Sequence, residues 1–326
     1  MATTALAYLW MLALPGVGRK TALLIGKRLT TPPAEVGSGF RDALRDAALG
    51  VPRFKLPDEA TLAAALLSAQ RTLEDAGRIG VGVVGFDDPS FPARLRRISD
   101  PPAVLYTKGA VEVLNRPVAI GVIGTREPSE FGLRSARRIG SRLPGLGATV
   151  VSGLAIGCDA AGHWGCVDAK GVGVAVLAHG LHTVSPAGNR ELAEKLLENG
   201  GCLVSEYGPG VAAQRTYFVE RDRLQSGLSD GLIVVETAEK GGTMHTVGFA
   251  LEQRRPVGCI DHPVALREHP KAAGNRAMLK DGRATPLADQ ASLMKFVADA
   301  TGAPGAPSIS DQAAGDVLSL FGPSDA

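Results

Sequence analysis

Three short polar turns, each placed after an apolar run, are the residues of this chain best suited to hold an anion. A glycine turn after a buried strand leaves backbone N–H groups pointing at open space, where the next helix begins and its dipole favours negative charge. Arg126 adds a guanidinium to the first turn. The three turns therefore predict a phosphate-lined crevice, and they comprise Gly124, Thr125 and Arg126; Ser152 and Gly153; and Gly241, Gly242 and Thr243.

A fourth segment interleaves cations with aromatic rings. Arg215, Arg221 and Arg223 alternate with Tyr217 and Phe218 between two of the predicted strands. Such a mixture suits a single-stranded nucleic acid, because bases stack on rings while cations neutralise phosphates. In the alternative interpretation Phe218 belongs to the core and the arginines line a solvated helix start.

The familiar catalytic motifs are absent from the sequence. The first turn does not follow the G-x-G-x-x-G pattern, and there is no P-loop, no G-x-S-x-G elbow and no H-E-x-x-H pair. Asp159 and His163 are four residues apart and could form a dyad, but a structural carboxylate at a helix start is the favoured interpretation. We expect no catalytic residue, no metal and no cofactor. The acid–base candidates considered are His163, His179, His182, His245, Asp159, Glu206 and Glu236.

Short apolar strands alternating with helices predict the element that positions these turns. This pattern indicates an α/β fold, an extended Rossmann-like doubly wound parallel sheet covered on both faces, with a hairpin formed by 81–86 and 101–106 attached to it. The predicted main strands are 118–123, 149–152, 173–177, 202–205, 231–235 and 257–260. The predicted helices of this region are 133–143, 189–198 and 246–253, and a helix is also expected to begin near Cys158.

The sequence before the α/β region is typical of helices. Four helices are predicted at 2–11, 18–29, 39–49 and 58–77. The segment between the first two resembles a helix-hairpin-helix, in which Gly16, Gly18, Arg19 and Lys20 would contact a nucleic-acid backbone without reading its sequence. A plain αα-hairpin without a ligand is the alternative. We predict a small helical domain at 1–78, the α/β domain at 79–288, and a short helix with a flexible tail at 289–326.

The composition sets few further limits. A net charge of +2 on 326 residues requires that any nucleic-acid affinity come from local clusters of Arg and Lys. The four cysteines form no C-x-x-C pair and are expected to be buried and reduced. No stretch reaches transmembrane length and no signal peptide is evident, so a cytoplasmic protein without membrane association is expected.

Many separated motifs together resemble DNA-processing protein A, the bacterial DprA/Smf family, over roughly residues 80–288. The resemblance implies an extended Rossmann-like fold that binds single-stranded DNA without catalysis. It also implies a homodimer that protects incoming DNA in natural transformation and loads the recombinase RecA for recombination. The matching segments are 86–92, 122–126, 151–159, 174–181, 186–189, 205–210, 218–229, 241–243 and 250–253.

The resemblance also implies which residues bind DNA. They are Gly124, Thr125, Arg126, Ser152, Gly153, Arg215, Phe218, Arg221 and Arg223, with Gly241, Gly242 and Thr243 closing the pocket. Asp222 stands where the family usually has Asn, which places a negative charge among the arginines. Two other functions share this kind of sheet. One is a nucleotide phosphoribohydrolase of the lysine-decarboxylase-like group, whose catalytic glutamate loop has no counterpart here, and the other is a nucleotide-sensing module.

Overall fold

The computed structural model describes residues 2–29, 38–52 and 54–302. The predicted flexible tail lies outside the described residues from residue 303 onward. A single nine-stranded sheet forms the centre of the molecule, in the order β1-β2-β6-β5-β4-β3-β7-β8-β9. The strands are β1 Gly82–Gly85, β2 Val104–Gly109, β3 Ala119–Ile123, β4 Thr149–Ser152, β5 Gly173–Leu177, β6 Cys202–Ser205, β7 Gly231–Val234, β8 Val257–Ile260 and β9 Thr285–Leu287.

The sheet is doubly wound, as predicted, although it is not wholly parallel. All pairings from β6 to β9 are parallel, whereas β1 pairs with β2, and β2 with β6, in antiparallel register. The predicted hairpin therefore extends one edge of the main sheet. From β3 the chain proceeds through β4, β5 and β6 in one direction, then returns to β7 on the other side of β3. This reversal opens a crevice beyond the carboxyl ends of β3 and β7.

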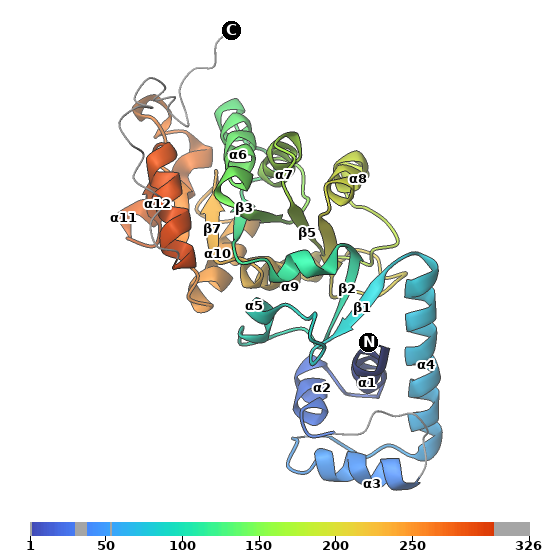
Figure 1. The fold of residues 1–326 in the computed structure, drawn as a ribbon. Helices are drawn as coiled ribbons and strands as arrows, with labels where there is room; N and C mark the ends of the chain where they lie inside the picture. Colours follow the sequence, from blue (N-terminus) through green and yellow to red (C-terminus); the bar gives the residue numbers. More distant parts are fainter. Residues whose placement is uncertain (1, 30–37, 53, 303–326) are drawn as a thin grey trace.

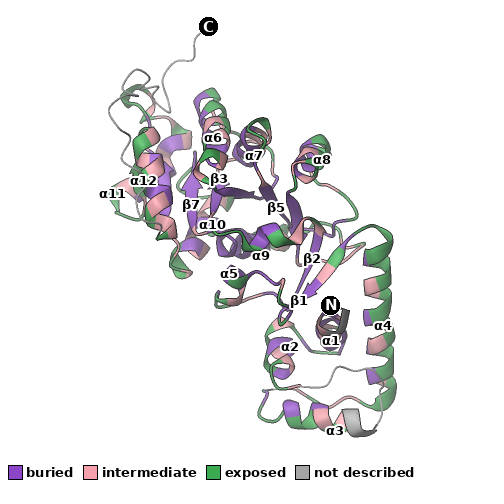
Figure 2. Cartoon of the chain, in the orientation of Figure 1, coloured by how far each residue is buried: buried purple, intermediate pink, exposed green. Residues whose placement is uncertain are grey.

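Helices cover both faces of the sheet, and Figure 1 shows α6, α7 and α8 on one side with α9 and α10 opposite. The strands between them are buried along their length (Figure 2), as expected for a parallel sheet enclosed by helices. The helices of this region are α5 Ala93–Arg96, α6 Glu130–Arg142, α7 Cys158–Asp168, α8 Arg190–Glu198, α9 Arg215–Gly227, α10 Gly242–Glu252, α11 Ala273–Lys280 and α12 Gln290–Thr301. The short 3₁₀ turns are Val111–Asn115, Pro144–Leu146, Ala187–Asn189, Val264–Leu266 and Pro270–Ala272.

Four helices precede the sheet: α1 and α4 pack against its β1–β2 edge, α2 packs on α1, and α3 lies beyond α2 (Figure 1). Their buried side chains, including Trp10 and Leu62, belong to the same apolar cluster as Phe91 and Leu105 of the α/β region. The helical segment and the sheet therefore share a continuous core. These helices are α1 Ala2–Leu12, α2 Arg19–Gly26, α3 Ser38–Ala47 and α4 Glu59–Arg78.

Several elements differ from the sequence-based expectation. The helix α11 and the edge strand β9 were not predicted, and α9 was expected only as a helix start in the alternative interpretation of its arginines. All the predicted strands and helices among the described residues are present within a few residues of their expected limits. All four cysteines are buried and free, as expected. Within residues 2–29, 38–52 and 54–302, no helix combines the length and the apolarity needed to span a bilayer.

Candidate nucleic-acid interface

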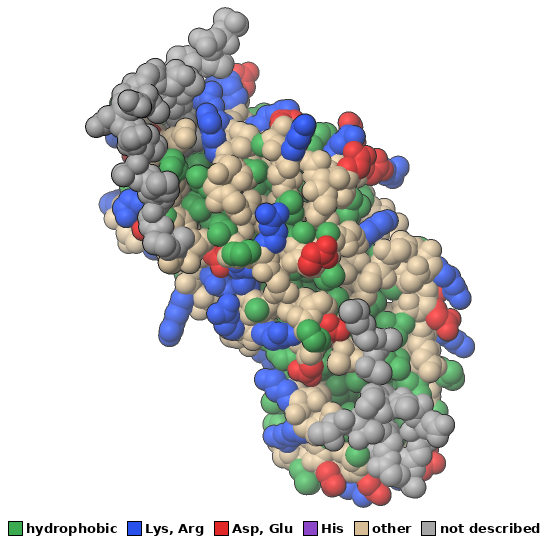
Figure 3. Space-filling view, in the orientation of Figure 1, with side chains coloured by type: hydrophobic (Ala, Val, Ile, Leu, Met, Phe, Trp, Pro, Cys, Tyr) green, Lys and Arg blue, Asp and Glu red, His purple; other side chains and the backbone are tan. Residues whose placement is uncertain are grey.

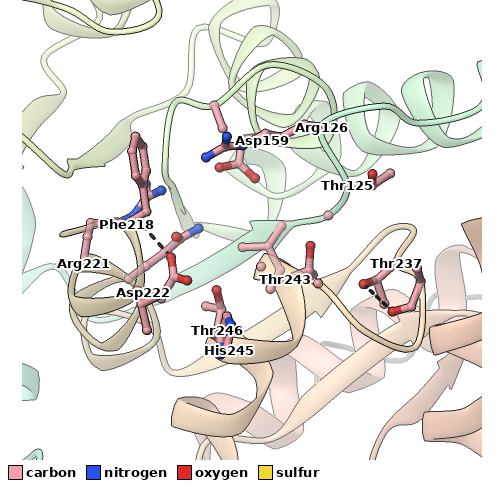
Figure 4. Close-up of a pocket in the computed structure, with 18 of the residues that line it drawn as sticks. Thr125, Arg126, Asp159, Phe218, Arg221, Asp222, Thr237, Thr243, His245 and Thr246 are labelled. Atoms are coloured by element: carbon pink, nitrogen blue, oxygen red, sulfur yellow. Dashed lines mark hydrogen bonds and ion pairs between the residues drawn. The ribbon is translucent and has the colours of Figure 1, made fainter. Parts of the chain in front are cut away.

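A cavity of about 470 Å³ lies at the reversal of the sheet, beyond the carboxyl ends of β3 and β7. The turn after β3, the start of α9 and the loop leading into α10 surround it (Figure 4). The volume falls in the range of about 300–1,000 Å³ that is common for small-molecule sites. Of the predicted DNA-contacting residues, the following line the cavity: Gly124, Thr125, Arg126, Arg215, Phe218, Arg221, Gly241, Gly242 and Thr243.

Three exposed cations line the cavity. Arg126 follows β3, Arg215 begins α9, and Lys240 precedes α10. Within the described part of the chain, none of the three has a carboxylate at ion-pair distance. The first residues of α9 and α10 also line the cavity, so the N-terminal ends of two helix dipoles add to its positive potential. This part of the cavity can hold phosphate.

An aromatic ring stands next to these cations. The Arg126 guanidinium lies over the Phe218 ring, with 5.0 Å between its Cζ atom and the ring centroid. This contact keeps Arg126 beside the cavity and leaves Phe218 partly accessible to a ligand. Tyr217, the neighbouring ring of the predicted cluster, stacks on Tyr207 with 4.1 Å between centroids. Phe218 is therefore the ring available for base stacking.

Arg221 is part of the cavity wall, but its side chain is mostly used within the protein. It is 5% exposed, and its Nη1 donates hydrogen bonds to the carbonyl oxygens of Gly153 (2.8 Å) and Val176 (2.7 Å). Its Nε lies 3.3 Å from an oxygen of Asp222. These bonds join α9 to β5 and to the turn after β4, so Arg221 chiefly fixes the position of the wall.

Arg223 does not reach the cavity, which departs from its predicted role. The side chain is buried, and its Nη2 donates to both carboxylate oxygens of Glu206 at 2.9 and 2.6 Å. Asp100 lies 3.5 Å from its Nε. A guanidinium buried in this way is not accessible to DNA, and we assign Arg223 to the framework that supports α9.

The predicted contacts at the end of β4 also lie beneath the cavity surface. The Ser152 hydroxyl donates to the carbonyl oxygen of Val122 at 2.7 Å, and Gly153 N donates to Asp159 at 3.0 Å. A Cβ atom at Gly153 would lie only 1.9 Å from Nη1 of Arg221. Glycine is required at this position because the arginine passes directly over the backbone.

Two carboxylates, those of Asp159 and Asp222, also line the cavity. Burial raises the pKa of Asp159, and burial raises the pKa of Asp222 to about 7, although the nearby Arg221 acts in the opposite direction on both. His163, the proposed partner of Asp159, is fully buried in α7 and does not line the cavity. The structure thus favours a structural role for Asp159 and His163 over a catalytic dyad.

The remaining acid–base candidates mostly support the framework. Glu236 accepts hydrogen bonds from the backbone nitrogen (2.8 Å) and hydroxyl (2.5 Å) of Ser129, which anchors the start of α6. His179 is buried and accepts a hydrogen bond from Ser185 N at 3.2 Å. His245, in contrast, is exposed and lines the cavity.

The predicted helix-hairpin-helix turn lies in the helical region, away from the cavity. Gly16 adopts a positive φ of 73° in the turn, and Lys20 is exposed. Arg19, however, is bound to Asp100 through Nε (3.1 Å) and Nη2 (2.5 Å). The hairpin is thereby attached to the α/β region, and Lys20 remains an exposed cation of the turn.

Sequence reasoning missed several lining residues, namely Gln225, Thr237, Lys240 and Thr246. Lys240 stands immediately before the predicted Gly241–Gly242 turn, so its position next to a glycine turn was a usable signal. Gln225 and Thr246 could not be found in this way, because they face the cavity only after α9 and α10 pack together.

Comparisons with known proteins agree with this architecture. The family model of DNA recombination-mediator protein A matches residues 82–298. The chain is 35% identical to DNA processing protein DprA of Bacillus subtilis over 203 residues, which cover 62% of this chain and 67% of that protein. It is 36% identical to protein Smf of Escherichia coli over 196 residues, 60% of this chain, and spans about half the length (51%) of that relative.

Two solved structures share the fold. The structure of DNA processing protein A from Streptococcus pneumoniae matches with a TM-score of 0.67 and 24% identity, over 83% of this chain and 90% of that one. The Helicobacter pylori protein, whose single-stranded DNA binding mode has been described, matches with a TM-score of 0.59 and 22% identity, over 67% of this chain and 94% of that one. Because the family model covers more than half of the sequence, the chain belongs to the DNA recombination-mediator protein A family, also known as DprA/Smf.

Proposed function

We propose that this protein binds single-stranded DNA in the cavity at the sheet reversal. The observation that carries the proposal is the set of three cations, Arg126, Arg215 and Lys240, which have no ion-pair partner among the described residues and surround the partly accessible ring of Phe218. The cations and the two helix termini would hold phosphates, and the ring would stack a base. A chain with a net charge of only +2 needs such a local cluster to bind a polyanion. Figure 3 shows acidic side chains interspersed with Lys and Arg over the face it presents.

We further propose that the protein acts by binding and not by catalysis. Most of its acid–base candidates are used within the framework: Glu206 pairs with Arg223, Glu236 anchors Ser129, and His163 is fully buried. Release of free base from nucleoside monophosphates would instead support the phosphoribohydrolase alternative.

We also propose that the protein acts in the cytoplasm as a homodimer. It would protect the bound strand and pass it to RecA during transformation or recombination. Membership of the family supports this role, since relatives carry the name DNA processing protein. Light scattering would give the oligomeric state. Assembly of RecA on single-stranded DNA, with and without the protein, would test the loading step.

The direct test of DNA binding is the Arg126→Ala variant, measured by fluorescence anisotropy with a labelled single-stranded oligonucleotide. Loss of the phosphate contact, and of the guanidinium that lies over the Phe218 ring, is expected to weaken binding by about 1–3 kcal/mol. The slope of log K against log salt should also decrease in magnitude by about one. The expected loss carries no loss of stability, because Arg126 is exposed and has no ion-pair partner within the described chain.

Arg71→Ala is a matched control. Arg71 is an exposed arginine on α4, in the helical region away from the cavity (Figure 1). The control should bind as the wild type does. Equal affinity of wild type and Arg126→Ala at every salt concentration would refute the placement of DNA in this cavity.

A further inference from the structure

The inner part of the cavity has groups that phosphate does not require. Asp222 and Gln225 lie one turn apart on α9, and Thr246 faces them from α10. In Figure 4, Asp222 lies between Phe218 and Thr246. A carboxylate at this position opposes phosphate binding, which suggests that another part of the ligand occupies this end of the cavity.

The Asp222 carboxylate retains capacity to accept hydrogen bonds. Its side chain is 10% exposed, and its contacts are the Arg221 Nε at 3.3 Å and a hydrogen bond with Thr246. Above its raised pKa, the Asp222 carboxylate is ionised and offers about four acceptor sites, so these two contacts leave others for a ligand. Gln225 is 2% exposed, and its Nε2 has no hydrogen-bond partner among the described residues. The wall thus offers acceptors next to an unused donor.

This pattern matches one nucleobase better than the others. The edge of guanine carries two adjacent donors, N1–H and the 2-amino group, beside the acceptor O6. Two parallel N–H groups fit the two oxygens of a carboxylate, and O6 can accept from an amide. Thymine presents one donor between two acceptors, and an acceptor facing a carboxylate is repelled. Phe218 lies beside Asp222 and can stack the base whose edge Asp222 binds.

We propose that Asp222, with Gln225, makes this cavity selective for a guanine base in the bound strand. The proposal rests on the proposed function, since it assigns to the same cavity a preference among the bases of single-stranded DNA. Arg221 partly neutralises Asp222, and Arg126, Arg215 and Lys240 keep the phosphate of the same nucleotide at the outer end.

The test compares oligothymidylate with the same oligonucleotide carrying guanine, adenine or cytosine at every fourth position. We expect the wild type to bind the guanine-containing strand about tenfold more tightly than oligothymidylate, as for one bidentate pair. In Asp222→Asn the amide replaces one acceptor oxygen by a donor, so the guanine preference should fall to about twofold or less. Affinity for oligothymidylate should be kept or increased, since a negative charge is removed.

Glu127→Gln is the matched control, because it removes a charge next to Arg126 from a residue that does not line the cavity. Its ratio of affinities for the two strands should equal that of the wild type. Thermal unfolding of each variant checks that the fold is kept. A guanine preference that persists in Asp222→Asn, or an equal loss of affinity for all strands, would overturn the inference.

The outcomes for the two proposals are distinct. If the wild type binds all strands equally, the base selectivity is wrong and the single-strand function stands. If it binds no strand, the proposed function is wrong. Calorimetric titration with deoxyguanosine and deoxythymidine monophosphates then tests whether the cavity prefers guanine in a single nucleotide. Equal binding of the two nucleotides, or no binding of either, would refute the guanine preference.

Discussion

Arg223→Ala separates a framework arginine from a DNA-contacting one. Arg223 is 3% exposed and gives two hydrogen bonds to Glu206, whose side chain is 13% exposed. Removal of the guanidinium leaves a buried carboxylate without its main donor. Breaking a buried ion pair in this way costs about 3–5 kcal/mol. At about 2–4 °C per kcal/mol for a chain of this size class, the melting temperature should fall by on the order of 10 °C.

The assay is urea denaturation followed by circular dichroism, together with DNA binding at a temperature where the variant is folded. The free energy of unfolding should decrease by the amount given above, while the folded variant keeps an affinity within about threefold of the wild type, less than the effect of losing a direct contact. Arg78→Ala is the control, because Arg78 forms ion pairs on the surface of α4 with its side chain 70% exposed. Its stability should change by less than about 1 kcal/mol.

A second variant tests the reason for the loss. Replacing both partners, as Glu206→Gln with Arg223→Met, removes the unpaired charge and should recover much of the stability. The reasoning is refuted if Arg223→Ala keeps its full stability and loses DNA binding as strongly as Arg126→Ala. That result would place Arg223 on the DNA-binding surface.

Two further predictions concern stability. Gly140→Ala should destabilise the fold by about 3 kcal/mol, since its Cβ would lie 1.9 Å from the carbonyl oxygen of Gly162 where α6 and α7 meet. Gly248→Ala, in an open position on α10, should instead stabilise it by about 1 kcal/mol, and chemical denaturation of both variants checks the contrast. Burial lowers the pKa of His163 to about 4, so the unfolded chain binds a proton between pH 6.5 and 4 that the folded protein does not. The free energy of unfolding should therefore decrease as the pH is lowered through this window, by about 2 kcal/mol at pH 5. The raised pKa of Asp222 changes the free energy of unfolding with pH in the opposite direction. The contribution of His163 is therefore the difference between the pH slopes of the wild type and of His163→Asn, and identical slopes would contradict the prediction.

The order of helices and strands could be predicted from the sequence because its signals are local. Buried parallel strands such as 173–177 and 257–260 are short, nearly all-apolar runs between turn residues, and the structure gives these two the same limits. The segment 215–227 shows no such signal: α9 buries Arg221, Asp222 and Arg223 together with its apolar residues. A polar helix that is buried through ion pairs resembles an exposed loop in sequence.

The place of the candidate site was also accessible from the sequence, because parallel strands bring the turns after β3 and β7 to one edge of the sheet. The role of each arginine was not. Arg126 and Arg223 were both predicted to contact DNA, yet one is exposed beside Phe218 and the other is bound by Glu206 and Asp100. Those carboxylates are distant in the chain from the arginine they neutralise. Residue types and spacing therefore predict that cations gather at this edge, whereas long-range pairing in the folded chain determines which of them remain free for a ligand.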